Sequence, residues 1–412
     1  MRTKNPDVVV VGAGIAGASI AAVLARGGLE VLLLERQRAY RDRVRGEYMA
    51  PWGVLEARAL GLETVIRGAH AVDARYSVPY DELREPSAAE AAKGDASTIL
   101  PGVRGPLCAS HPGACQALAS EAVRLGAELV SGVTAVHVHA GTRPSVTYLD
   151  GTQMQVRPRL IIGADGRSST VRQQSGIRIS KAPASHVIAG LLVEGASRWP
   201  ADQFSIGVEG DLQFYVFPQG GERLRLYTCH ATEQAARWAG RAGPQRFLQA
   251  FAHLQAIPAA LGLGHVTPAG PCATFGGEQT WCDRPYADGV VLLGDAGGYD
   301  DPVDGQGLSL ALRDVRQLSE LLLTTGDWSL AGLRPYGLQR AERLRRMRRV
   351  STTFAALRTT FTADGRARRS RYEAASEARR EEVALALGAI HLGPDRLPTE
   401  AFSDQLHESL LA

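Results

Sequence analysis

The N-terminal stretch DVVVVGAGIAGASIAAVLARGGLEVLLLER, residues 7–36, restricts the fold more than any other part of the chain. Its pattern predicts a buried parallel strand at 8–11, a glycine turn, a helix, and a second strand at 31–34. Residues 8–25 carry no charge and follow Arg2 and Lys4, which also suits a signal peptide or a membrane span. The glycines fall at the offsets of a strand-turn-helix unit, so the sequence favours a βαβ unit and no membrane span.

Three glycines and one glutamate indicate that this unit binds a nucleotide. Gly12 allows the tight turn, Gly14 lets the backbone approach a pyrophosphate at the helix N-terminus, and Gly17 lets helix and strand pack closely. Glu35 ends the second strand, where a carboxylate accepts hydrogen bonds from both hydroxyls of an adenosine ribose and disfavours a 2'-phosphate. FAD or NAD therefore fits this site and NADP does not. A glycine-rich turn without a ligand is the structural alternative.

Composition narrows the class of partner. The chain has 412 residues, 45% of them hydrophobic and 22% charged, which is typical of a globular protein with two or three domains. A net charge of +3 gives little support to nucleic-acid binding and favours a small-molecule partner. The five cysteines form no C-x-x-C pair, so the sequence indicates neither a disulfide framework nor a metal site and suggests the cytoplasm.

Two later stretches also join an apolar strand to a helix. One is LIIGADGRSSTVR, residues 160–172, and the other is GVVLLGDAGGYDDPVDGQG, residues 289–307, followed by a helical pattern. Strand-to-helix junctions of this kind are places where anionic ligands bind.

The three motifs GAGIAG at 12–17, GADGRSSTVR at 163–172 and GDAGGYDDPVDGQG at 294–307 occur in a known order and spacing. Together they resemble the FAD-dependent aromatic hydroxylase family, the single-component flavoprotein monooxygenases related to para-hydroxybenzoate hydroxylase, over about residues 5–345. The resemblance implies an α/β fold with a discontinuous Rossmann-type FAD-binding domain, an inserted antiparallel β-sheet substrate domain and a C-terminal helical segment. The implied boundaries are 1–75, 101–180 and 283–340 for the FAD-binding domain, 76–100 and 181–282 for the substrate domain, and 341–412 for the C-terminal helices.

The resemblance also implies residue roles. Asp295 would accept a hydrogen bond from a ribitol hydroxyl, and Pro302 would shape the wall beside the flavin ring. The helix opened by Gly305-Gln306-Gly307 would point its N-terminal amides at the isoalloxazine. Asp165 would help hold the pyrophosphate region, and Arg45 would contact the phosphates or the reductant. The predicted cofactor-binding residues are Gly12, Gly14, Gly17, Glu35, Arg36, Arg45, Asp165, Asp295, Pro302, Gly305, Gln306 and Gly307.

Some positions depart from the family pattern or have no family role. Asp300, Asp301 and Asp304 are interpreted as solvated loop acids or helix caps. Gly297-Gly298 stands where relatives often have Ala-His, and His111 stands near the place of an arginine that contacts FAD in many relatives.

Residues 181–280 contain four strand-like runs separated by turn residues, and 246–262 read as a helix broken at Pro258. In DLQFYVFPQ, alternation puts Gln213, Tyr215 and Phe217 on one face, which we predict to face the substrate pocket; an ordinary sheet face is the alternative. The arginine-rich helices beyond 340 are interpreted as solvated or subunit-facing, not as a nucleic-acid surface.

The predicted function is hydroxylation of an aromatic or other electron-rich small molecule by dioxygen, through a flavin C4a-hydroperoxide, with NADPH or NADH as the reductant. The flavin carries the chemistry, so no side chain is predicted as a nucleophile and no metal is expected. The rival functions are an FAD-dependent reductase or dehydrogenase, for example one that saturates prenyl chains, and a flavin-dependent halogenase. The bias toward arginine and alanine is typical of a GC-rich bacterium, where natural-product tailoring is one setting for such an enzyme.

Overall fold

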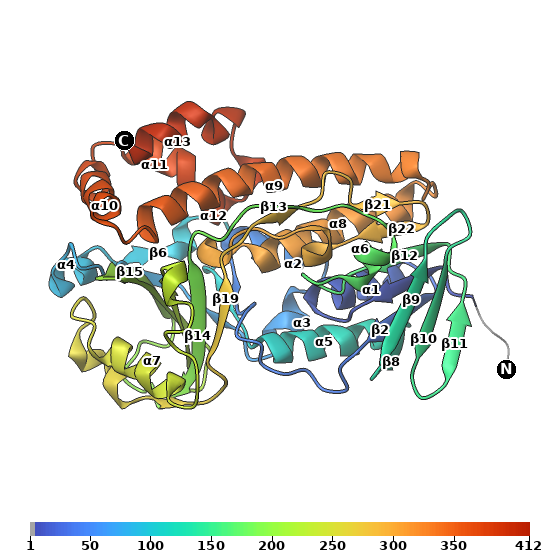
Figure 1. The fold of residues 1–412 in the computed structure, drawn as a ribbon, viewed down its shortest axis with the longest axis horizontal. Coiled ribbons are helices and arrows are strands. Elements are labelled where there is room, and N and C mark those ends of the chain that lie inside the picture. Colours follow the sequence, from blue (N-terminus) through green and yellow to red (C-terminus); the bar gives the residue numbers. More distant parts are fainter. Residues whose placement is uncertain (1–4) are drawn as a thin grey trace.

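The computed structural model describes residues 5–412, so the predicted start of the FAD-binding segment at 1–4 lies outside the described residues. Two large sheets lie side by side, and helices of the C-terminal third run along one side of both (Figure 1). The predicted α/β class is confirmed, with a Rossmann-type FAD-binding fold, an antiparallel sheet and helices at the C-terminus.

The first sheet has six strands in the order β21-β22-β12-β1-β2-β8. Val8 of β1 pairs with Val31 of β2 and with Leu160 of β12, so segments far apart in the sequence become neighbours. All adjacent pairs are parallel except β21 with β22, and the carboxyl ends of the parallel strands therefore share one edge. The strands are β1 (Val8–Val11), β2 (Val31–Glu35), β8 (Glu128–Ser131), β12 (Leu160–Gly163), β21 (Tyr286–Ala287) and β22 (Val290–Leu292).

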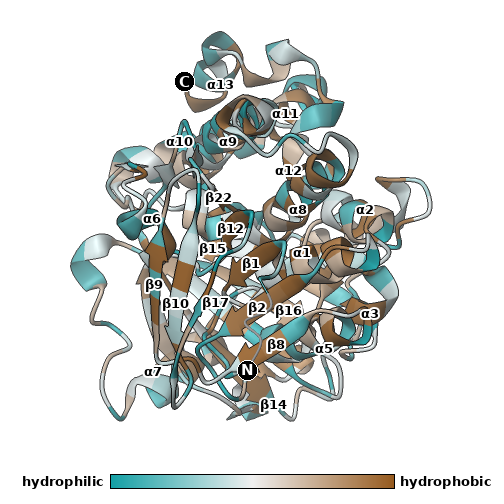
Figure 2. Ribbon diagram, turned by 90° about the vertical axis from the view of Figure 1, so that its right-hand side faces the viewer, coloured by the Kyte–Doolittle hydropathy of each residue, from teal (hydrophilic) through white to brown (hydrophobic). Residues whose placement is uncertain are grey.

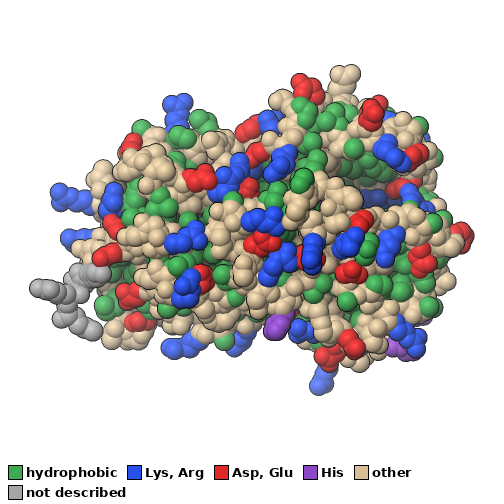
Figure 3. Space-filling view, turned by 180° about the vertical axis from the view of Figure 1, so that it is seen from behind, with side chains coloured by type: hydrophobic (Ala, Val, Ile, Leu, Met, Phe, Trp, Pro, Cys, Tyr) green, Lys and Arg blue, Asp and Glu red, His purple; other side chains and the backbone are tan. Residues whose placement is uncertain are grey.

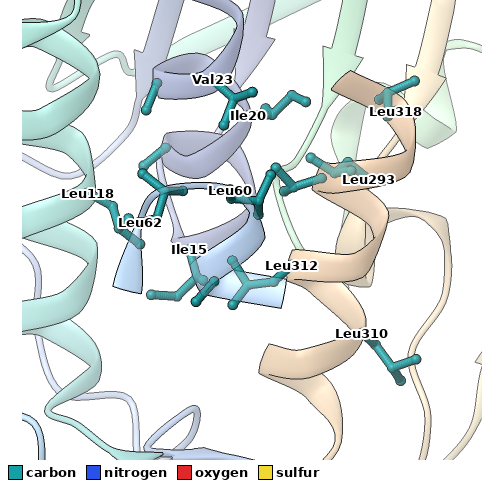
Figure 4. Packing of buried hydrophobic residues seen from close by; sticks show 14 of the residues in the cluster. Ile15, Ile20, Val23, Leu60, Leu62, Leu118, Leu293, Leu310, Leu312 and Leu318 are labelled. Atoms are coloured by element: carbon teal, nitrogen blue, oxygen red, sulfur yellow. The ribbon is translucent and has the colours of Figure 1, made fainter. Parts of the chain in front are cut away.

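This sheet is buried on both faces, which explains the unbroken valine run of β1. Val8 and Val10 pack in the cluster beneath α1 (Ile15–Arg26), α5 (His111–Arg124) and α8 (Gly307–Thr324). Val9 and Val11 face the three-stranded sheet of β9 (Ala135–His139), β10 (Ser145–Leu149) and β11 (Gln153–Val156). The central strands are accordingly hydrophobic in Figure 2, and Figure 4 shows Ile15 of α1 next to Leu312 of α8.

The second sheet follows the order β18-β14-β17-β16-β15-β5-β6, and β19 pairs with β14. The four predicted strand-like runs form its four longest strands, and only β15 with β5 pairs in parallel. Its strands are β14 (Val187–Glu194), β15 (Gln203–Glu209), β16 (Leu212–Pro218), β17 (Leu224–His230), β5 (Tyr76–Val78), β6 (Gly94–Asp95), β18 (Thr267–Pro268) and β19 (Ala273–Gly276). One face packs on α7 (Gly243–Ala252) and the other turns toward the first sheet.

The predicted helix at 246–262 is wrong in its extent. Helix α7 ends at Ala252, and a separate 3-10 turn at 259–261 follows Pro258. Between them, the backbone N–H groups of Gln255 and Ala256 donate to the carboxylate of Glu209 at 3.0 and 2.8 Å. These contacts with β15 replace the bonds that would continue the helix.

The C-terminal helices are more deeply integrated than the sequence predicts. Helix α9 (Leu330–Arg358) runs without interruption through the predicted boundary at 340, and α10 (Ala363–Ala375), α11 (Arg380–Leu387), α12 (Ala389–Leu392) and α13 (Asp404–Leu411) follow it. Arg340 and Arg343 of α9 are fully buried against Asp314 of α8, so the interpretation of this run as solvated is wrong for them. Buried arginines persist where a carboxylate and carbonyl groups satisfy them, a context that residue type alone does not reveal.

The outer surface carries both signs of charge. On the face in Figure 3, basic and acidic side chains alternate without a broad area of one sign. No described helix combines the length and the apolar content that crossing a bilayer requires.

Candidate cofactor and substrate site

One cavity of about 940 Å³ extends from the shared carboxyl edge of the first sheet to the inner face of the second sheet. All three motifs contribute to its wall, through residues such as Gly14, Asp165 and Asp295. The C-terminal helices complete the wall with Phe354 of α9 and with Ile390 and His391 of α12.

The three glycines of the first motif have different surroundings. Gly12 has φ +98°, and a Cβ atom there would lie 2.6 Å from the Ala164 carbonyl oxygen, so the turn requires glycine. A Cβ at Gly17 would lie 1.8 Å from the Gly12 carbonyl oxygen, which makes Gly17 a packing position. A Cβ at Gly14 would meet no atom within 4 Å, and Gly14 lines the cavity. Gly14 therefore borders open space at the N-terminus of α1, where a phosphate group can approach the backbone.

Glu35 is fixed at the end of β2. Its Oε2 accepts from the Ala13 N–H and its Oε1 accepts from the Gln37 N–H, both at 2.8 Å. Each carboxylate oxygen keeps a second acceptor site, as binding two ribose hydroxyls requires. Glu35 and Arg36 both line the cavity.

Asp165 of the middle motif forms its hydrogen bonds with neighbouring residues of the protein. Asp165 accepts hydrogen bonds from the Ser169 hydroxyl and from the Thr170 and Val171 N–H groups, at 2.5, 2.7 and 3.1 Å. It thereby shapes the turn that brings Arg167 to the cavity wall, where Arg167 stacks over the Tyr299 ring at 4.2 Å. Asp165 thus fixes the position of this loop, and its role in cofactor binding stays a prediction.

The third motif forms the side of the cavity next to α8. Asp295 lines it, with its Oδ2 3.6 Å from Nε of Arg167. Pro302, Gly305 and Gly307 line it as well, and Gly307 opens α8 as predicted. Gln306 is fully buried outside the cavity wall, where its side chain accepts from the Trp52 indole N–H at 2.8 Å. The Gln306 side chain is therefore committed within the protein, and the predicted contact of Gln306 with the cofactor has no support from the cavity lining.

Arg340 supports this loop and is a residue that the sequence did not single out. Its guanidinium donates to the carbonyl groups of Gly294, Gly297 and Gly298 at 2.8, 2.6 and 3.0 Å, and its Nε lies 2.7 Å from Asp314. Asp314 lies on the apolar face of the helix predicted after residue 307. A carboxylate on such a face needs a buried cationic partner, and this was the sequence signal for a residue like Arg340.

The part of the cavity wall around Arg45 is rich in arginine. Burial and the neighbouring Arg167 lower the pKa of Arg45. Burial, together with Arg45 and Arg43, lowers the pKa of His111 to about 4, although the backbone contact with Gly46 opposes the shift. Both residues line the cavity, so this wall favours an anion that would relieve the repulsion between its cations.

The second sheet presents aromatic rings to the other end of the cavity. Tyr215 and Phe217 line it as predicted, with ring centroids 5.8 Å apart, whereas Gln213 is buried outside the wall. Tyr227 also lines it, and its hydroxyl forms a very short hydrogen bond with Glu47. Burial, and next the charge of Glu47, raise the pKa of Tyr227 well above its usual value.

Asp300, Asp301 and Asp304 are not solvated, and that interpretation is wrong. All three are buried, with 7%, 4% and 7% of their surface exposed. Asp301 does cap the turn at 302–304, since its Oδ1 accepts from the Val303 N–H at 3.0 Å. Helix α9 packs over this loop and buries the three acids. No local sequence pattern predicts that contact.

A sequence model of the FAD binding domain matches residues 5–351 of this chain. The chain belongs to this FAD-binding family. The protein is 28% identical over 348 residues to digeranylgeranylglycerophospholipid reductase 2 from Methanococcoides burtonii, covering 80% of this chain and 78% of the relative. It is also 28% identical to rifampicin monooxygenase from Rhodococcus hoagii, over 79% of this chain and 66% of that protein. Kynurenine 3-monooxygenase from Salinispora tropica is 28% identical over 80% of this chain and 76% of the relative.

Among solved structures, p-nitrophenol 4-monooxygenase from Pseudomonas putida superposes with a TM-score of 0.78 over 96% of this chain and 100% of that one, at 19% identity. That likeness shows the shared fold. The predicted membership of the FAD-dependent aromatic hydroxylase family is confirmed, and the FAD-binding protein is an oxidoreductase of the FAD-dependent monooxygenase class.

The residues present fit FAD. Open space at Gly14 and Gly307 admits a ligand to two helix N-termini, and the anchored Glu35 suits a ribose. The arginine-rich wall around Arg45 suits a pyrophosphate. Asp295, in the third motif, offers a hydrogen-bond acceptor to a cofactor hydroxyl.

We expect Glu35→Ala to weaken FAD binding by roughly tenfold to a hundredfold, because hydrogen bonds to a charged group are lost. The preference between NADH and NADPH should stay unchanged, since Glu35 serves the adenosine of FAD. Titrating apo-protein with FAD and comparing kcat/KM for the two nicotinamides test both points. Thermal unfolding of the apo-proteins controls for the loss of the Ala13 and Gln37 contacts. A switch of nicotinamide preference would contradict the assignment of Glu35 to FAD.

Proposed function

We propose that the protein hydroxylates an aromatic or other electron-rich small molecule, using dioxygen and consuming NADPH or NADH. The observation that carries this proposal is the aromatic end of the cavity. Its wall holds the rings of Tyr48, Tyr215, Phe217, Tyr227 and Phe354 beside the loop that contains Pro302 and Gly305. Bound FAD supplies the redox chemistry, taking up reducing equivalents from the nicotinamide and activating dioxygen.

The chain's own residues position the reactants and exclude water. The stacked rings of Tyr215 and Phe217 offer flat apolar surface on which an aromatic substrate can be oriented. The N-terminal amides of α8 point toward the cavity at Gly307, where they favour negative charge. The aromatic part of the wall helps to keep bulk water away from the reacting atoms. The five cysteines are free thiols, which supports a reducing cytoplasm as the setting.

A reductase is the second candidate, favoured by the similarity to digeranylgeranylglycerophospholipid reductase 2. A halogenase has less support. The fold of a flavin-dependent brominase is similar, at 17% identity, but the sequence contains no W-x-W-x-I-P stretch, which is typical of flavin-dependent halogenases. In addition, neither Lys93 nor Lys181, the lysines within residues 5–412, lines the cavity.

Screening aromatic compounds for stimulation of NADPH or NADH oxidation tests the proposal. We expect a hit to accelerate nicotinamide oxidation several-fold and to gain one oxygen atom, visible by mass spectrometry with labelled dioxygen. The matched control is the same mixture without oxygen, in which the flavin should be reduced once and no product should form. Turnover without oxygen, with saturation of an alkene, would move the protein to the reductase class.

A further inference from the structure

Two carboxyl groups at the aromatic end of the cavity share a single hydroxyl group. The Ser351 Oγ lies 2.7 Å from Asp300 Oδ2 and 2.7 Å from Asp304 Oδ2, and also 3.0 Å from the Met347 carbonyl oxygen. A hydroxyl group has one proton to donate, so these contacts cannot all be donated by Ser351. At least one carboxyl group must carry a proton of its own, and the pair then bears one negative charge at most.

The surroundings agree with one shared proton. Burial raises the pKa of Asp300 to about 7, and burial followed by the charge of Asp300 raises the pKa of Asp304 far above its usual range. Asp301, the third acid of the loop, has its own partner, because His186 Nε2 lies 3.3 Å from its Oδ1. Burial opposes a charged His186, but Asp301 and Cys229 raise its pKa to about 10.

Asp304 is the member of the pair with an unused acceptor. The second oxygen of Asp300 accepts from the Gln279 amide at 3.0 Å, and Arg348 provides nearby positive charge. The Oδ1 atom of Asp304 is buried and has no hydrogen-bond partner, although Asp304 lines the cavity. The closest tyrosine hydroxyl on the second sheet is already engaged, since Tyr215 donates to the Val303 carbonyl at 2.6 Å. A buried acceptor without a donor calls for one from outside the chain.

Both signs of charge line the cavity beside the first sheet, since Glu35, Asp165 and Asp295 stand there together with arginines. Among residues 5–412, the arginines in the wall come from the loops after β2 and β12, except Arg340, which is committed to Asp314 and three carbonyl groups. The strands of the second sheet contribute no arginine or lysine to the wall. Glu47, the other acid at this end, is held by Tyr227 and by Arg225, whose Nη2 lies 3.1 Å from Glu47 Oε1.

We propose that the aromatic end of the cavity selects a flat substrate that presents a hydroxyl or amine donor to Asp304, and that the Asp300–Asp304 pair excludes aromatic carboxylates. This inference rests on the proposed function and names the substrate class of that site. Asp304 is then a specificity-determining residue, which binds the substrate and carries out no bond-breaking step.

Binding to the oxidised holoenzyme tests the inference without turnover. The probes are naphthol, naphthylamine, methylnaphthalene and naphthoate, all substituted at the same ring position, and flavin absorbance near neutral pH reports binding. We expect the naphthol and naphthylamine to bind about tenfold more tightly than methylnaphthalene, as a hydrogen bond to a buried neutral acceptor would give, and naphthoate to show no binding. Because NADPH and NADH are absent, donor-selective binding in a protein that fails to hydroxylate would contradict the proposed function alone.

Three variants connect the selectivity to the pair. Asp304→Asn should reduce the preference for naphthol over methylnaphthalene by about tenfold and allow naphthoate to bind. Asp300→Asn should keep the donor preference but weaken the exclusion of naphthoate, which provides a second test if the first variant fails to fold. The control is Asp211→Asn, an acid between β15 and β16 that pairs with Arg237 outside the cavity wall, which should leave the ranking unchanged. Naphthoate binding as tightly as naphthol, binding of none of the probes, or an unchanged ranking in Asp304→Asn would overturn the inference.

Discussion

Gly14→Val should lose FAD while the fold stays intact. A Cβ at this position meets no protein atom within 4 Å, so the valine side chain enters only the space where the ligand approaches the backbone. Overpacking of this kind costs about 1–3 kcal/mol, or roughly fivefold to more than a hundredfold in affinity. The purified variant should be nearly colourless, and a fluorescence titration with FAD gives the loss of affinity.

Two other glycine variants make the result interpretable. Gly113→Ala, in the first turn of α5, would place its Cβ at an ordinary 3.6 Å from its neighbours and should retain FAD. Gly17→Ala would place a Cβ 1.8 Å from the Gly12 carbonyl oxygen and should lower the thermal stability of the apo-protein itself. A yellow Gly14→Val protein with wild-type affinity would show that FAD does not lie at this turn.

Gly305→Val should uncouple nicotinamide oxidation from hydroxylation. Gly305 has φ +72°, a conformation that costs about 1–2 kcal/mol for other residues, and its Cβ would lie 2.7 Å from the Tyr48 ring. The backbone must move, together with the cavity wall between Pro302 and α8. We expect the ratio of hydrogen peroxide to hydroxylated product to rise by about tenfold, corresponding to a shift of about 1.4 kcal/mol between the competing reactions.

Gly326→Val is the matched control for this variant. Gly326 lies just beyond the opposite end of α8, has φ +65°, and borders open space. It should therefore carry a similar backbone cost, visible in thermal unfolding, and leave coupling intact. Equal peroxide release in both variants would show that lost stability, and not the wall at Gly305, causes the uncoupling.

The cofactor side of the cavity was predictable because its signals are local. Gly12 adopts a positive φ, Gly17 packs against Gly12 of the same turn, and Gly307 opens the helix that its own motif begins. Alternation along β16 likewise put Tyr215 and Phe217 on the face that lines the cavity, since side chains in a strand alternate whatever lies opposite. Alternation could not tell that Gln213, on the same face, is buried outside the wall.

The remaining features depend on contacts between distant segments. Asp304 meets Ser351, which lies 47 positions away, and the burial of both comes from the packing of α9. The Gln306 side chain turns to Trp52 because α2 (Pro51–Ala59) packs against α8, and Arg340 reaches the third motif across the same interior. The sequence predictions assumed that charged and amide side chains are exposed, as they usually are. In this protein their positions depend on partners from distant segments.

The position of β1 in its sheet has a consequence for biosynthesis. On the ribosome, β1 can pair with β2 at once, but its other edge stays open until residues 160–163 emerge to form β12. An exposed edge of four valines invites pairing with other chains in the meantime. The cavity wall around residues 294–311 emerges much later still, and Phe354, Ile390 and His391 follow it. FAD can therefore stabilise only a nearly finished chain, and the nascent protein must keep its apolar centre from aggregating without help from its cofactor.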